Sequence, residues 1–125
     1  MLPKRFATRR ATWTVAISWM AFIFALSSLP SSHVPSTGSS FGHFGVYFVL
    51  GVILFHAFSY ETPARDRAFA LAVIAASLYG VTDELHQAFV PGRVPDVVDW
   101  AVDTLGALAG ASVALVLAPR RISAS

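Results

Sequence analysis

The sequence predicts an all-α fold: a polytopic membrane bundle of four transmembrane helices with both termini in the cytoplasm. Hydrophobic residues make up 55 % of the 125 positions and charged residues 13 %, whereas soluble domains carry roughly 25 % charged residues. The apolar residues fall in four segments of about the length that crosses a bilayer. Eight of the nine bases flank these segments at ends that four crossings place on one side. The length fits a single transmembrane domain, 1–125.

The composition also excludes some classes of protein. The chain has no cysteine, so disulfides and thiolate metal sites are excluded. Because the bases gather at the ends of apolar segments, the formal charge of +2 does not indicate nucleic-acid binding.

The first span is expected at about 12–29. It follows a start, Met1–Arg10, that holds four bases and no acid. A cleaved signal peptide begins in the same way, but no small-x-small cleavage site follows, so we expect an uncleaved span. The next segment, 30–42, is rich in Ser, Gly and Pro, and we expect it to be a loop in which His33 is solvated.

The second span is expected at about 43–60. His43 and Tyr47 are four residues apart, so they share one face of this helix at the end next to the loop. His56 lies nearer the other end and is expected to be a packed or snorkelling side chain.

The third span is expected at about 67–89. Its purely apolar part, 68–81, covers about 21 Å of helix and cannot cross a hydrocarbon core of about 30 Å. The helix must therefore include the charged residues that follow, which places Asp83 inside the hydrocarbon.

The fourth span is expected at about 97–118, after the Pro91-Gly92 pair ends the third helix. Acidic and then small residues follow one stripe of this helix at spacings of three and four. They are Asp96, Asp99, Asp103, Gly106 and Gly110. The glycines suit close helix contact, either in the bundle or in a dimer.

The bases decide the orientation. Four lie at the N-terminus, two between the second and third spans and two after the fourth, so all eight share one side, which is the cytoplasmic side. The other side keeps Arg93 as its base and receives His43 with the acids of the last two spans.

Ionisable residues inside a membrane are candidate functional residues, because an Asp costs roughly 2.5–3.5 kcal/mol at a helix centre on insertion scales. We therefore predict catalytic candidates in the third helix and substrate-binding candidates around them. The catalytic candidates are Asp83, Glu84 and His86. The substrate-binding candidates are His43, Tyr47, Gln87, Arg93, Asp96, Asp99 and Asp103.

Pairing with Arg93, protonation, a bound cation or a water-filled cavity would offset this cost. Acids held close together resist joint ionisation, which suits a general acid or base near neutral pH. A neighbouring His can carry a proton or bind a metal. No standard zinc motif such as His-Glu-x-x-His is present, so the metal and any cofactor stay open, with a divalent cation among the options.

Simpler structural roles exist for some candidates. Asp96 and Asp99 suit the first turn of a helix, where the dipole favours acids. Arg93 suits a counter-ion as well as an anchor for an anionic headgroup. The three tryptophans suit packing and the membrane interface.

Several motifs resemble the VanZ-like family of bacterial integral membrane proteins. In chain order they are Ser27-Ser28-Leu29-Pro30, His43-Phe44 with Tyr47, Tyr79-Gly80, Asp83-Glu84, His86-Gln87, Phe89-Val90-Pro91-Gly92-Arg93, Asp96, Asp99 and Thr104-Leu105-Gly106 with Gly110. The resemblance implies a multi-pass protein of the bacterial cytoplasmic (inner) membrane and a link to sensitivity to teicoplanin and related glycopeptide and lipoglycopeptide antibiotics. Where the family usually has Asn before Thr-Leu-Gly, this chain has Asp103, which adds a charge to the stripe.

Three functions fit these residues. The first is an outward-facing acidic and histidine pocket that acts on or binds a cell-envelope component. The second is a non-catalytic membrane binding or interaction module, and the third is proton or cation translocation, for which the acid stripe is short. Expected partners are membrane lipids and a lipid-linked cell-wall component or a glycopeptide, but no nucleic acid. The sequence leaves open whether the protein is an enzyme and what its oligomeric state is.

Overall fold

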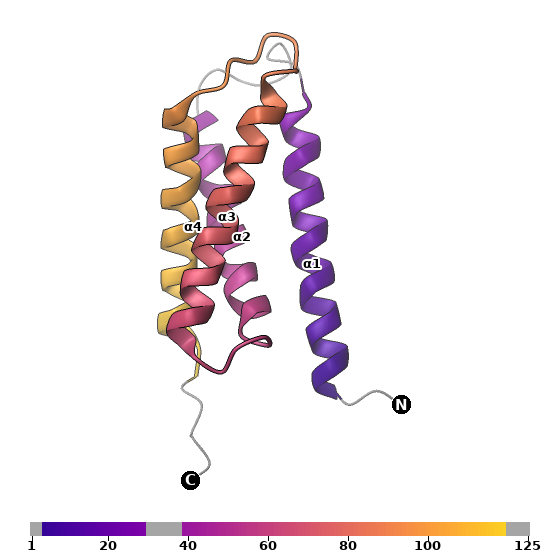
Figure 1. The fold of residues 1–125 in the computed structure, drawn as a ribbon, viewed down its shortest axis with the longest axis vertical. Coiled ribbons are helices and arrows are strands. Elements are labelled where there is room, and N and C mark those ends of the chain that lie inside the picture. The colour runs from indigo at the N-terminus through magenta and orange to yellow at the C-terminus, as the bar shows by residue number, and fades with distance from the viewer. Residues whose placement is uncertain (1–3, 30–38, 120–125) are drawn as a thin grey trace.

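The computed structural model describes residues 4–29 and 39–119, and within these ranges the regular structure is entirely α-helical. The helices are α1 (Lys4–Ser27), α2 (Ser39–Phe58), α3 (Arg65–Gln87) and α4 (Val97–Leu117). They alternate in direction, so that α1 begins and α4 ends at one end of the bundle, and the α3–α4 connection lies at the other end (Figure 1). All four are long and apolar enough to cross a membrane. The predicted all-α fold with four membrane-spanning helices is confirmed. His33 falls outside the described residues.

The helix ends follow local chemistry. α1 begins at Lys4, well before the span expected from residue 12, because the basic segment 4–10 contains no Gly or Pro to interrupt it. α3 ends at Gln87, and a tight turn follows in which the Arg93 N–H donates to the Val90 carbonyl at 3.1 Å. Gly92 has a φ of 76°, which glycine adopts without strain, and Pro91 precedes it, as in a type II turn.

The tightest contact in the bundle joins α2 to α4 through glycine. A Cβ added at Gly106 would lie 3.1 Å from the Cα of Phe44, and one added at Gly110 would lie 2.8 Å from the carbonyl carbon of Phe48. From the other side, a Cβ at Gly51 would lie 2.9 Å from the Cα of Ala107. The glycine stripe of α4 therefore lies against the backbone of α2, and it serves the bundle itself.

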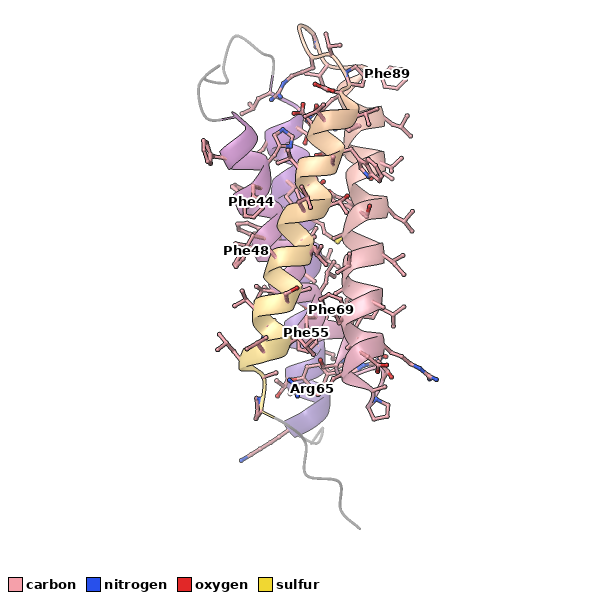
Figure 2. All side chains as sticks on the ribbon, turned by 90° about the vertical axis from the view of Figure 1, so that its left-hand side faces the viewer. Phe44, Phe48, Phe55, Arg65, Phe69 and Phe89 are labelled. Carbon is pink, nitrogen blue, oxygen red and sulfur yellow. The ribbon has the colours of Figure 1, made fainter. Side chains whose placement is uncertain are left out.

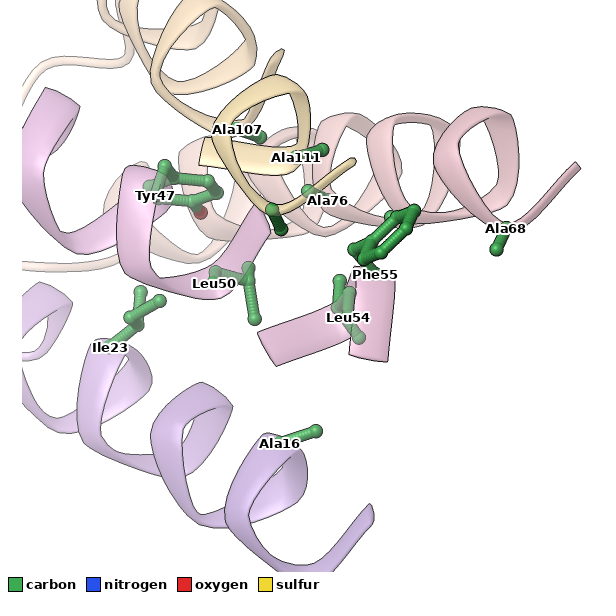
Figure 3. Packing of buried hydrophobic residues seen from close by; sticks show 12 residues of the cluster. Ala16, Ile23, Tyr47, Leu50, Leu54, Phe55, Ala68, Ala76, Ala107 and Ala111 are labelled. Carbon is green, nitrogen blue, oxygen red and sulfur yellow. The ribbon is translucent and has the colours of Figure 1, made fainter. Parts of the chain in front are cut away.

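Small residues also form the inner faces of α3 and α4, and α2 contributes larger side chains to the same core (Figure 3). α3 contributes alanines at every fourth position and α4 continues the pattern. The buried set comprises Ala68, Ala72, Ala76, Ala107, Ala111 and Ala114, with Tyr47, Leu50, Leu54 and Phe55 from α2. α1 adds Ala16 and Ile23.

Large apolar side chains point away from the bundle. On α3 they follow one stripe at spacings of three and four, opposite the buried alanines. This stripe consists of Leu71, Ile74, Leu78, Val81 and Leu85. A helix with small residues on its inner face and large apolar residues on its outer face suits lipid rather than water, because the hydrocarbon accepts apolar side chains.

Polar contacts close the end of the bundle where α1 begins and α4 ends. The Arg9 guanidinium donates to both carboxylate oxygens of Glu61, at 2.6 and 3.0 Å, and the Trp13 indole N–H donates to Glu61 at 3.0 Å. Arg65, near the lower end of Figure 2, donates to the carbonyl of Leu115 and, at 3.0 Å, to that of Ala118. These last bonds satisfy carbonyls that the end of α4 leaves free.

Candidate functional site

A buried polar cluster lies toward the opposite end of the bundle, where α1 and α3 end and α2 and α4 begin. Each of the four helices contributes to it. Its members are Ser27 of α1, His43 and Tyr47 of α2, Asp83 of α3 and Asp103 of α4, and we refer to these five residues as the buried cluster.

Asp83 accepts a hydrogen bond at each carboxylate oxygen. The Ser27 hydroxyl donates to Oδ1, and the Tyr47 hydroxyl donates to Oδ2 at 3.2 Å. Asp83 is 5 % exposed and Tyr47 is fully buried. Two hydroxyl donors therefore hold this carboxylate in one orientation inside the bundle.

Asp103 pairs with His43. The Nδ1 atom of the imidazole lies 2.8 Å from Oδ1 of Asp103, whose side chain is fully buried, while that of His43 is 16 % exposed. Oδ2 of Asp103 has no hydrogen-bond partner among the described residues. Gly80 faces this oxygen across the α3–α4 contact, where an added Cβ would lie 3.7 Å from it.

The two pairs adjoin one another. His43, Asp83 and Asp103 each offer one nitrogen or oxygen atom such that all three atoms lie within 4.8 Å of one another. Within residues 4–29 and 39–119, no Lys or Arg donates a hydrogen bond to these side chains or forms an ion pair with them. The cluster can hold a proton or a cation between its carboxylates, with the imidazole as a further base or ligand.

Glu84 lies beside the cluster and faces the α3–α4 connection. Its Oε2 accepts the backbone N–H of Asp96 at 2.9 Å, and its Oε1 is buried without a partner among the described atoms. Glu84 also borders a groove of about 250 Å³ between α3 and α4. The other lining residues are Val81, Leu85, Pro95, Asp96, Val97 and Trp100.

The fourth helix uses its first acids structurally. Asp96 is the N-cap, and its Oδ1 accepts the Val98 N–H at 2.9 Å, while Asp99 lies half-buried in the first turn. Both positions agree with the structural role that the sequence offered for them.

His86 and Arg93 were also expected at the site, and both lie outside the buried cluster. His86 stacks on Phe24 of α1 with ring centroids 4.1 Å apart, and its Nε2 lies 3.3 Å from the Ser28 hydroxyl. Arg93 donates from Nε to the Leu29 carbonyl at 3.0 Å and forms no ion pair in the described part of the chain. Its observed contact ties the α3–α4 connection to the end of α1. Gln87 is buried on the inner face of α3.

Ser27 was not among the expected site residues. Two features of the sequence pointed to it: a pair of serines at the end of a mostly apolar span, and the Ser27-Ser28-Leu29-Pro30 motif that resembles the VanZ-like family. Helical spacing relates residues on one helix, so it could not indicate that a hydroxyl of α1 meets a carboxylate 56 residues later.

Comparison with known proteins agrees with this architecture. Comparison with curated proteins and with solved structures gives no significant match. The family model described as VanZ/LLP1 matches residues 6–118, which include all four spans apart from the first two residues of α1, and it confirms the resemblance seen in the motifs. This multi-pass membrane protein therefore belongs to the VanZ/LLP1 family.

Proposed function

We propose that this protein lies in the bacterial cytoplasmic membrane, binds a component of the cell envelope at the buried cluster, and thereby changes sensitivity to glycopeptide antibiotics such as teicoplanin. The cluster would face the exterior. The family supports the link to glycopeptides, and the chain's own residues support the site.

The distribution of bases supports this orientation. Five bases belong to the first two turns of α1 and α3, which both begin at the end of the bundle where α4 ends: Lys4, Arg9, Arg10, Arg65 and Arg67. In short-loop membrane proteins the side rich in bases is the cytoplasmic side. The buried cluster belongs to the other end, which would then be exterior.

One observation carries the proposal: carboxylates from two helices and an imidazole from a third meet inside membrane-spanning segments. An Asp in a membrane-spanning helix costs roughly 2.5–3.5 kcal/mol at the helix centre on insertion scales and less near the interface. A buried ionic group also stabilises a fold less than apolar residues of similar volume often would. Stability alone therefore does not explain the cluster, whereas recognition of a polar ligand does.

The groove next to Glu84 supports an amphiphilic ligand. Its wall is largely apolar, with Val81, Leu85 and Trp100 from the two helices. Glu84 and Asp96 also line this groove. A lipid-linked cell-wall component or an acylated glycopeptide combines an apolar chain with polar groups in the same way. Such a ligand would lay its chain along the groove and its polar part toward the carboxylates.

Translocation of protons or cations has less support. Between the cluster and the basic end, the core is built from Leu50, Leu54, Phe55 and the alanines of α3 and α4. These side chains offer no relay for a charge. A binding site open to one side fits this distribution better than a pathway.

The proposal is tested in a teicoplanin-sensitive bacterial host that expresses the wild type or single variants, with membrane levels measured by immunoblot. We expect Asp83→Asn to remove the change in teicoplanin sensitivity at unchanged protein levels. Asp66→Asn is the matched control, because Asp66 is an exposed acid at the other end of the same helix. If cells that express Asp83→Asn at normal levels show the same teicoplanin sensitivity as cells that express the wild-type protein, the proposed site is refuted.

A further inference from the structure

We propose that His43, Asp83 and Asp103 bind one divalent transition-metal ion, and that Zn²⁺ suits this donor set. The inference rests on the proposed function in one respect, since it names what the same buried cluster would hold.

The donor atoms of the three side chains lie close enough together to bind one ion. The three donor atoms come from three helices and lie within 4.8 Å of one another. Ligands at 2.0–2.2 Å in a tetrahedral zinc site are about 3.3–3.6 Å apart. A separation of 4.8 Å would have to close by roughly 1.2–1.5 Å, which side-chain rotation can supply, while the 2.8 Å contact between His43 and Asp103 must open slightly.

One carboxylate oxygen of the cluster lacks a hydrogen-bond partner among the described residues. Oδ2 of Asp103 belongs to a fully buried side chain and has no partner among the described residues. Buried polar atoms almost always have a partner in the protein, an ordered water or an ion. A metal ion at the cluster would supply that partner.

The negative charge of the two carboxylates also favours a divalent ion. Asp83 and Asp103 bring two carboxylates into membrane-spanning helices, and no Lys or Arg contacts them within the described ranges. A protonated His43 could balance only one of the two. A divalent ion bound by neutral imidazole balances both, and so removes the net charge from the low-dielectric interior.

The chemistry of the donor atoms narrows the choice of metal ion. Imidazole nitrogen with carboxylate oxygens suits Zn²⁺ and its first-row neighbours, whereas Mg²⁺ and Ca²⁺ prefer oxygen ligands throughout. The hydroxyls of Ser27 and Tyr47 already orient Asp83, as outer-shell donors do around metal ligands. Three protein ligands leave a fourth position, where an oxygen of an envelope phosphate or carboxylate could bind.

The metal content of the purified full chain tests this inference. The protein in detergent is equilibrated with ZnCl₂, passed through a desalting column and analysed for zinc by mass spectrometry. We expect about one zinc per wild-type chain, with a large loss in Asp83→Asn and Asp103→Asn. We expect unchanged zinc in Asp66→Asn and in His56→Gln, the exposed acid and histidine on α3 and α2.

Two further measurements keep the test independent of variant folding. Zn²⁺ should raise the Tm of the wild type and EDTA should reverse the rise, with Mg²⁺ giving a much smaller shift. Co²⁺ should bind in place of Zn²⁺ and give a visible absorption band. A wild-type protein with no bound zinc and no Tm shift would overturn the inference, as would equal zinc in all variants, which indicates binding elsewhere.

The metal site and the proposed function can fail separately. If wild type holds no zinc while Asp83→Asn still abolishes the teicoplanin phenotype, the metal inference is overturned and the proposed function stands. If zinc binds at one per chain and depends on Asp83, while Asp83→Asn leaves the phenotype intact, the metal site is supported and the proposed function is refuted.

Discussion

Replacing Gly110 by Ala should force α2 and α4 apart. The new Cβ would lie 2.8 Å from the carbonyl carbon of Phe48, and closer still to its oxygen. Comfortable carbon contacts begin near 3.5 Å, so the carbonyl carbon alone requires the two backbones to separate by roughly 0.7 Å, and the closer oxygen requires more. Overpacking of this kind typically costs about 1–3 kcal/mol in folding free energy.

Gly45→Ala is the matched control, because a Cβ at Gly45 meets nothing within 4 Å. Both glycines are helical, so the gain of about 1 kcal/mol that Ala brings to a helix is common to both variants and cancels in the comparison. The difference that remains, about 1–3 kcal/mol, corresponds to roughly a 5- to 150-fold difference in the unfolding equilibrium. Unfolding in mixed detergent and SDS micelles, followed by tryptophan fluorescence, measures it. Equal stability of the two variants would refute the backbone contact between α2 and α4.

Two further predictions concern the ends of the bundle. Hydrogen bonds from Arg9 and Trp13 lower the pKa of Glu61 below its ordinary 4.5. The stabilisation of the fold by these bonds is therefore fully present above pH 4.5, and it is lost as the pH falls through the lowered pKa of Glu61. Glu61→Gln should flatten this part of the stability–pH profile, and an unchanged profile would contradict the ion pair. Because the chain lacks cysteine, Val94→Cys and Pro63→Cys each introduce a single thiol at an exposed position. In intact cells a membrane-impermeant maleimide should label Val94→Cys but not Pro63→Cys, and the reverse pattern would invert the proposed orientation.

The spans could be read from sequence because a bilayer admits few structures. Only helices satisfy their backbone within a single short segment in hydrocarbon, so four apolar segments predict four helices. Helical periodicity also placed His43 with Tyr47 on one face, and it placed Gln87 on the face of Asp83. The structure buries Tyr47, Asp83 and Gln87 together on the inner side of the bundle.

Contacts between helices could not be read in this way. Asp103 and His43 are 60 residues apart, and no local rule pairs them. The same spacing that groups His86 with Asp83 leaves His86 about 60° to one side, where Phe24 of α1 covers it. Arg93 lies in a connection without periodicity, so its contact with the Leu29 carbonyl had no sequence signal.

A double-mutant cycle on teicoplanin sensitivity tests most directly whether side chains of different helices form one functional site. The variants are His43→Gln, Asp83→Asn and the two combined, all at equal membrane levels. Residues that act as a unit give strongly non-additive losses, so the combined variant should be no more impaired than the worse single variant. If the losses of the two single variants multiply in the combined variant, or if neither single variant shows a loss, these side chains do not form one functional site.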